Sequence, residues 1–158
     1  DARIAPIYEG TNGIQAIDLV MRKLPLEEGE HVHTYIDELV AIAGSVRTSN
    51  LSGFGTTADL LDRALEDLSE ATRFIQDRLS AGETDAALAG ATPYLRMMSL
   101  AAGGAYLARG ALADRGQDRV ALCRFYAENL LCDVAALRER VLGGAASLGE
   151  AAGALLVS

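Results

Sequence analysis

Residues 57–79, TADLLDRALEDLSEATRFIQDRL, show most clearly how this chain folds. Apolar side chains recur there every three or four positions, at Leu61, Ala64, Leu68, Ala71, Ile75 and Leu79. This spacing predicts a long amphipathic helix with one face in a core. Thr56 or Thr57 is placed to cap its start, and Ala81-Gly82 to end it. Acidic residues early in the segment and arginines later complement the helix dipole.

The same spacing recurs along the rest of the chain. It predicts helices over about 12–23, 30–48, 84–115 and 117–142, with Pro93 either kinking the third of these or starting a new helix. We expect the inward face of 84–115 to hold Leu95, Met98, Ala102, Ala105, Arg109 and Leu112. That of 117–142 should hold Val120, Ala127, Leu131, Val134, Leu137 and Val141.

No segment shows the alternation of a strand, so the predicted class is all-α. Short loops between long helices favour an up-and-down bundle of about four long helices, preceded by a turn and one helix. Gly143-Gly144 is expected to stop the last long helix. Residues 146–158 then form a tail, with one short helix around 148–156.

Charge and hydropathy exclude several partners. The formal net charge of −8 argues against binding to nucleic acid or to an anionic membrane surface. No apolar run approaches the length of a membrane span, and no signal peptide opens the chain. Cys123 and Cys132 are predicted to be buried thiols on opposite faces of one helix, typical of a reducing compartment such as the cytoplasm. No metal site is predicted, since His31 and His33 lack further ligands.

The first fifteen residues, DARIAPIYEGTNGIQ, do not read as helix until Gly13 or Ile14. Pro6 favours extended backbone, while Gly10 and Gly13 bracket Thr11-Asn12 and permit a tight turn. Thr11 or Asn12 can cap the following helix, with Glu9 held at the turn. The exposed backbone N–H groups of that helix start suit an anionic ligand.

This run resembles the signature of the acyl-CoA dehydrogenases, in which a Tyr-Glu-Gly-Thr motif carries the catalytic base. Two further stretches, PYLRMMSLAAGGAYLARGALA at residues 93–113 and CRFYAENLL at residues 123–131, resemble the extra C-terminal helical domain of a subset of that family. The subset includes enzymes acting on long-chain acyl-CoAs and on 3-methylmercaptopropionyl-CoA. This second resemblance covers most of residues 30–145.

The resemblance implies roles for the motif. Glu9 would be the base that removes the α-proton of an acyl-CoA, while FAD takes the β-hydride. Tyr8 and Gly10 would contact substrate. The FAD would be approached by Thr11, Asn12 and Gly13. Burial beside apolar groups would raise the pKa of such a carboxyl toward working pH.

The resemblance also implies domain boundaries. Residues 1–25 would end a catalytic α-domain, 30–145 would form an appended bundle, and 146–158 a tail. Because such enzymes are several hundred residues long, the chain is expected to be a C-terminal fragment that is inactive alone. Ile4, Ile7 and Ile14 would then lack native cover. Electron-transfer flavoprotein would be the electron acceptor, and the protein would form homo-oligomers.

Two alternatives stay open at this point. The chain could be a non-catalytic helical interaction or oligomerisation module, or a segment of an acyl-CoA oxidase. Arg96, near Tyr94, and Arg124, beside Phe125 and Tyr126, could each meet a CoA phosphate. Surface ion pairs are the favoured interpretation of both arginines.

Overall fold

The structure is a computed structural model that describes residues 11–49, 51–114 and 116–156. These residues are helical and contain no strand, which confirms the all-α class. Ten elements follow one another: α2 (Thr11–Asp18), the π-helical η1 (Leu19–Lys23), the 3-10 turn η2 (Leu26–Gly29), α3 (Glu30–Thr48), the 3-10 turn η3 (Ser52–Phe54), α4 (Thr57–Ser80), α5 (Thr84–Ala89), α6 (Ala91–Asp114), α7 (Gln117–Asn129) and α8 (Asp133–Leu156).

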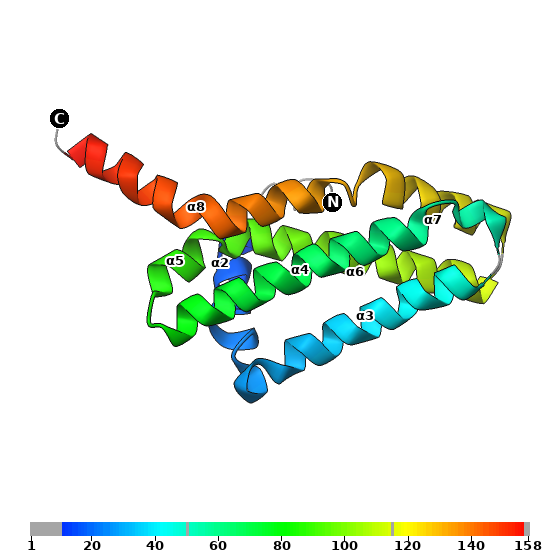
Figure 1. The fold of residues 1–158 in the computed structure, drawn as a ribbon, viewed down its shortest axis with the longest axis horizontal. Coiled ribbons are helices and arrows are strands. Elements are labelled where there is room, and N and C mark those ends of the chain that lie inside the picture. Colours follow the sequence, from blue (N-terminus) through cyan, green and yellow to red (C-terminus); the bar gives the residue numbers. More distant parts are fainter. Residues whose placement is uncertain (1–10, 50, 115, 157–158) are drawn as a thin grey trace.

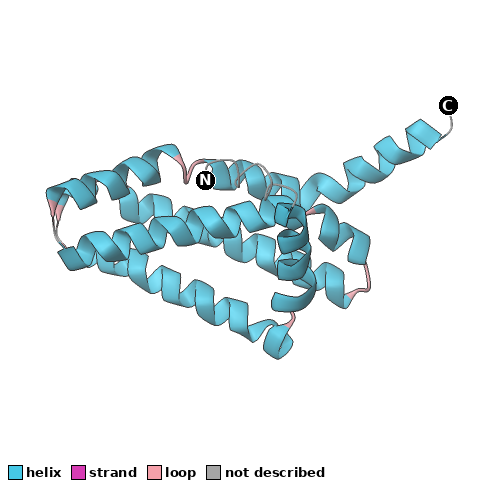
Figure 2. Ribbon diagram, turned by 180° about the vertical axis from the view of Figure 1, so that it is seen from behind, coloured by secondary structure: helices cyan, strands magenta, loops and turns pink. Residues whose placement is uncertain are grey.

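The long helices run up and down, as predicted (Figure 1). Along the bundle axis α3 and α6 point one way, and α4 points the other. The fourth long segment of the bundle consists of α7 followed by the first part of α8. The rest of α8 extends away from the bundle, and α2 crosses the face turned to the viewer in Figure 2.

The core is centred on α6, which touches α2, α3, α4, α7 and α8. Gly104 makes this position possible. A Cβ there would lie 3.1 Å from Cδ2 of Leu61 on α4 and 3.2 Å from Cδ2 of Leu131. The absence of a side chain lets α6 approach its neighbours closely.

The predicted inward face of α6 was fully correct only at Ala105. Its fully buried positions are Ala91, Tyr94, Met97, Ala101, Gly104, Ala105, Ala108 and Ala111, whereas Arg109 is exposed. Leu95, Met98, Ala102 and Leu112 are only half-buried. A helix contacted from several sides has apolar residues all round, so its sequence does not mark one inward stripe.

The later helix boundaries agree with the prediction only in part. The fourth predicted helix divides at Gly90 into α5 and α6, and Pro93 lies in the first turn of α6, in agreement with the alternative that a new helix starts there. The fifth divides at Leu130–Cys132 into α7 and α8. Gly143-Gly144 does not stop α8, which continues to Leu156, because glycine weakens a helix without ending it. Residues 148–156 are helical as predicted, but they continue α8 and do not form a separate short helix.

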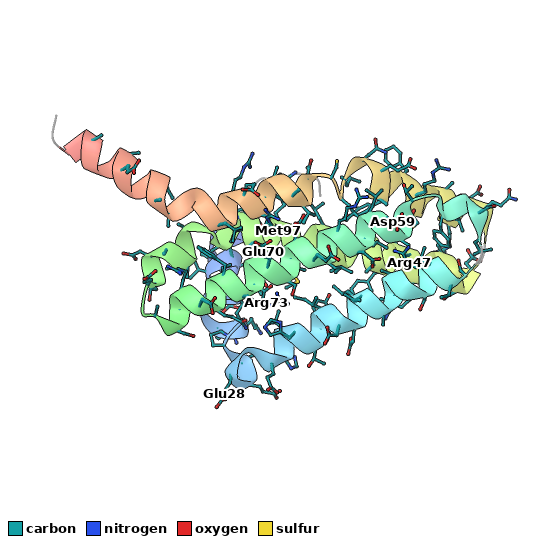
Figure 3. All side chains as sticks on the ribbon, viewed as in Figure 1. Glu28, Arg47, Asp59, Glu70, Arg73 and Met97 are labelled. Atoms are coloured by element: carbon teal, nitrogen blue, oxygen red, sulfur yellow. The ribbon has the colours of Figure 1, made fainter. Side chains whose placement is uncertain are left out.

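Packing confirms most other predicted contacts. The predicted inward residues of α4 are buried except Leu79, which is half-buried, and all six of the α7–α8 stripe are buried. Cys123 is buried, but Cys132 is exposed because the break at Leu130–Cys132 takes it off the predicted continuous helix. At the far end of the bundle Arg47 on α3 joins Asp59 on α4, with 2.9 Å between Nη1 and Oδ1 (Figure 3).

Candidate functional site

The motif lies at the boundary of the described residues. Tyr8, Glu9 and Gly10 fall outside them, so their predicted roles stay predictions. Thr11, Asn12 and Gly13 form the first turn of α2. Asn12 and Gly13 are exposed, and a Cβ on Gly13 would meet no atom within 4 Å.

The helix that follows has two apolar faces. One packs into the bundle through Ala16 and Val20, both fully buried, with α6 as the neighbour. The other is exposed: Ile14 is 66% accessible, Ile17 49% and Met21 43%. Three exposed apolar side chains at helical spacing form a surface suited to contact with other protein. This surface directly follows the motif.

The turn after α2 is held in an unusual backbone conformation. Glu27 and Glu28 have φ of 51° and 59°, and Gly29 has φ of 92°. Left-handed backbone is uncommon for glutamate and persists where surrounding contacts hold it.

Gln76 of α4 supplies those contacts. It donates from Nε2 to the Gly29 carbonyl at 3.2 Å, and its Oε1 lies 2.9 Å from Nε2 of His33. The amide oxygen of Gln76 can only accept a hydrogen bond. Nε2 of His33 is therefore the donor in this contact and carries the proton. This contact fixes the start of α3 against α4, and through η2 it positions α2. The glycine was visible in the sequence, but its partner 47 residues away was not.

The two arginines that lie near aromatic residues in the sequence both form surface ion pairs with carboxylates. Arg96 reaches Asp133 with 3.2 Å between Nη2 and Oδ2, and Arg124 reaches Glu128 with 2.7 Å between Nε and Oε1. This agrees with the favoured interpretation. No cluster of three or more metal-ligating side chains occurs within the described part of the chain.

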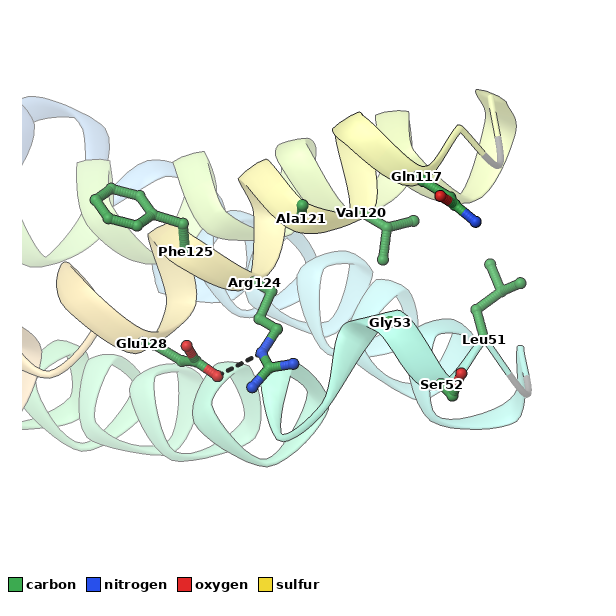
Figure 4. Close-up of a pocket in the computed structure, with 9 residues that line it drawn as sticks. All are labelled: Leu51, Ser52, Gly53, Gln117, Val120, Ala121, Arg124, Phe125 and Glu128. Atoms are coloured by element: carbon green, nitrogen blue, oxygen red, sulfur yellow. Dashed lines mark hydrogen bonds and ion pairs between the residues drawn. The ribbon is translucent and has the colours of Figure 1, made fainter.

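An open pocket of about 480 Å³ lies between η3 and α7 (Figure 4). Its walls are Leu51, Ser52, Gly53, Gln117, Val120, Ala121, Arg124, Phe125 and Glu128. Sequence reasoning singled out Arg124 and Phe125 but missed the pocket. The wall opposite α7 comes from η3, a turn that lies far earlier in the chain. Helix periodicity does not reveal which distant segments lie side by side.

Comparison with known proteins decides the family. Residues 30–152 match the family described as "Acetyl-CoA dehydrogenase C-terminal like". The chain belongs to the acyl-CoA dehydrogenase C-terminal family. It is also similar to 3-methylmercaptopropionyl-CoA dehydrogenase of Ruegeria pomeroyi, with 31% identity over 155 residues. That alignment covers 89% of this chain and 26% of the relative. No solved structure gives a significant match.

The helix that follows the motif, α2, packs directly on the bundle. Ala16, Val20 and Leu24 belong to the same hydrophobic core as α3, α4 and α6. None of the helices in the described ranges is long and apolar enough to cross a membrane. The chain spans about a quarter of the relative's length (26%).

Proposed function

We propose that this chain is part of an FAD-dependent acyl-CoA dehydrogenase in which Glu9 is the catalytic base. Family membership and the similarity to 3-methylmercaptopropionyl-CoA dehydrogenase carry the proposal. The Tyr-Glu-Gly-Thr run at residues 8–11 supplies the candidate base.

The chain's own residues would act on substrate as follows. Glu9 takes the proton from the α-carbon of the acyl-CoA thioester and holds it as a neutral carboxylic acid. Tyr8 and Gly10 contact the acyl and thioester ends and keep water from the carboxyl, which raises its pKa and thus its basicity. FAD, when bound, accepts the hydride from the β-carbon. The product is a 2-enoyl-CoA.

The first turn of α2 fits part of the cofactor site. The N-terminal end of an α-helix in general favours anionic groups such as a flavin pyrophosphate. Asn12 and Gly13 are exposed, and Gly13 leaves space for close approach. Thr11, Asn12 and Gly13 would therefore hold the phosphate portion. The rest of the flavin site requires protein outside this chain.

The remaining assignments concern the whole protein. The reoxidising partner would be electron-transfer flavoprotein, the location cytoplasmic and the assembly a homo-oligomer. The exposed face of α2 formed by Ile14, Ile17 and Met21 would meet the catalytic domain. The 158-residue chain alone would retain no FAD and turn over no substrate. A flavin absorbance band that stays with it through gel filtration would contradict this.

The test is Glu9→Gln in the intact polypeptide that contains this chain. Glutamine keeps the shape of the side chain and removes the base, so FAD should stay bound. Anaerobic mixing with acyl-CoAs should then bleach the flavin band about 10²- to 10⁴-fold more slowly than in the wild type. The wild-type series identifies the preferred acyl chain.

Glu30→Gln is the matched control. The same change occurs at an exposed residue that begins α3, outside the motif, so bleaching should keep its wild-type rate. Unchanged bleaching in Glu9→Gln would place the base elsewhere. Absence of flavin from the intact wild-type protein would favour the interaction module.

A further inference from the structure

The pocket between η3 and α7 has a chemistry that the proposed dehydrogenase reaction does not use. Three of its lining side chains are apolar: Leu51 from the η3 side, and Val120 and Phe125 from α7. Phe125 is 59% exposed although it lies on a packed helix. Ser52 and Gln117 also line it, and neither side chain has a hydrogen bond to another of the described residues. An apolar wall with a few polar groups is the usual composition of a small-molecule site.

Arg124 provides the charged group of the pocket. Its Nε donates to Glu128 at 2.7 Å, which leaves the edge formed by the two Nη groups without a partner among the described residues. Figure 4 shows the guanidinium between Glu128 and the η3 turn. Two Nη donors on one edge match the two oxygens of a carboxylate. Glu128 thus orients the arginine and leaves its paired donors available.

The η3 turn holds this arrangement in place. A Cβ on Gly53 would lie 2.9 Å from Cγ1 of Val120, so a glycine is needed for the turn to lie this close to α7. At Gly55, where φ is +54°, a Cβ would lie 3.1 Å from Nε of Arg124. The guanidinium therefore rests against backbone. A pre-arranged arginine loses less freedom when it binds a ligand.

Charge limits what the pocket can hold. Arg124 and Glu128 balance each other, and the chain carries a formal net charge of −8. A polyanion such as a nucleotide would be repelled, whereas a monoanion can be held by one guanidinium. The volume of about 480 Å³ lies within the range of roughly 300–1,000 Å³ typical of small-ligand pockets.

We propose that this pocket binds a small monocarboxylate with an apolar body. The carboxylate accepts hydrogen bonds from the two Nη groups of Arg124, and the apolar body lies against Leu51, Val120 and Phe125. This proposal does not depend on the dehydrogenase proposal.

The probe is sodium octanoate, titrated into the ¹⁵N-labelled chain and followed by amide chemical shifts. We expect saturable shifts confined to residues 51–53 and 117–128. Arg124→Gln should weaken binding about tenfold or more, the loss of a charge-assisted hydrogen-bonded pair. Arg124→Lys keeps the charge without the paired donors and should also weaken it. Ala121→Trp should block the pocket and abolish binding.

Arg96→Gln is the matched control, because it removes an exposed ion-paired arginine outside the pocket and should leave the affinity within about twofold. 1-Octanol and inorganic phosphate separate the two halves of the ligand, and each should bind about tenfold or more weaker than octanoate. Absence of saturable shifts, or equal binding by Arg124→Gln, would overturn the proposal. Equal binding of 1-octanol or of phosphate would overturn it too. If Arg124→Gln unfolds, Arg124→Lys and Ala121→Trp decide in its place.

Discussion

At the scale of single residues, Tyr94 and Thr72 form a buried polar contact between α6 and α4. Their hydroxyl oxygens are 2.8 Å apart, and the Thr72 hydroxyl also donates to the Leu68 carbonyl at 2.7 Å. Since that hydroxyl has one proton, the Tyr94 hydroxyl must be the donor between the two. Both hydroxyl groups are thus hydrogen-bonded. Tyr94 depends on Thr72 as its acceptor, whereas Thr72 donates to Leu68 whether or not Tyr94 is present.

Thr72→Val should therefore be more destabilising than Tyr94→Phe. The first change leaves the Tyr94 donor buried and unpaired, and should lower the free energy of unfolding by about 1–3 kcal/mol. The second leaves Thr72 bonded to Leu68 and should lower it by about 0.5–1.5 kcal/mol. Urea unfolding measures both. The double variant should lose less than the sum of the two, and strict additivity would show that the hydroxyls do not interact.

At the scale of elements, glycines in helices have different consequences according to what lies beside them. Gly104 on α6 faces Leu61 and Leu131, whereas a Cβ on Gly44 of α3 would meet no atom within 4 Å. Both are interior helical positions where glycine costs backbone entropy. Only the helix–helix approach at Gly104 compensates for that cost.

The same substitution at these two sites should change stability in opposite directions. Gly104→Leu should lower the free energy of unfolding by about 1–3 kcal/mol, because the new side chain overpacks the interface of α6 with α4 and α8. Gly44→Leu should raise it by about 0.5–1 kcal/mol through helix propensity. Thermal melts followed by circular dichroism compare them. Stabilisation by Gly104→Leu would mean that α6 is not closely packed.

At the scale of the whole molecule, one core joins all the long helices and encloses several groups that ionise at high pH. Burial raises the pKa of the Cys123 thiol from 9.0 to about 11, and that of Tyr94 from 10.0 to about 12. Burial, with a smaller contribution from the hydrogen bond between Tyr35 and Tyr106, raises the pKa of Tyr35 to about 12. In each case the folded state favours the neutral form.

Stability should accordingly fall in alkali. Above pH 9 the unfolded chain loses protons that the folded chain retains, so the free energy of unfolding decreases as the pH rises toward 11 and 12. Urea midpoints at a series of pH values measure this. Cys123→Ala should flatten the decrease between pH 9 and 11, because it removes one of these groups. Cys132→Ala, at an exposed thiol, should leave it unchanged. A midpoint independent of pH over this range would contradict the burial of Cys123.

What the sequence by itself determined is the helical class, the up-and-down order and the family. Spacing every three or four residues marks a helix with one buried face, so α3 and α4 end within a residue or so of their predicted bounds. A short motif can likewise point to a reaction, because a chemical step needs particular side chains in a particular order. The base at Glu9 is still a prediction of that kind.

Only the tertiary structure decided the inward face of α6, the break between α7 and α8, and the pocket at Arg124. Each depends on residues far apart in the chain: Gly104 faces Leu61, and Gly53 faces Val120. Periodicity reports which residues share a face of one helix, but it carries no information on which helix lies opposite. A central helix such as α6, apolar on several sides, and a pocket shared between a turn and a distant helix become visible only when the chain is folded.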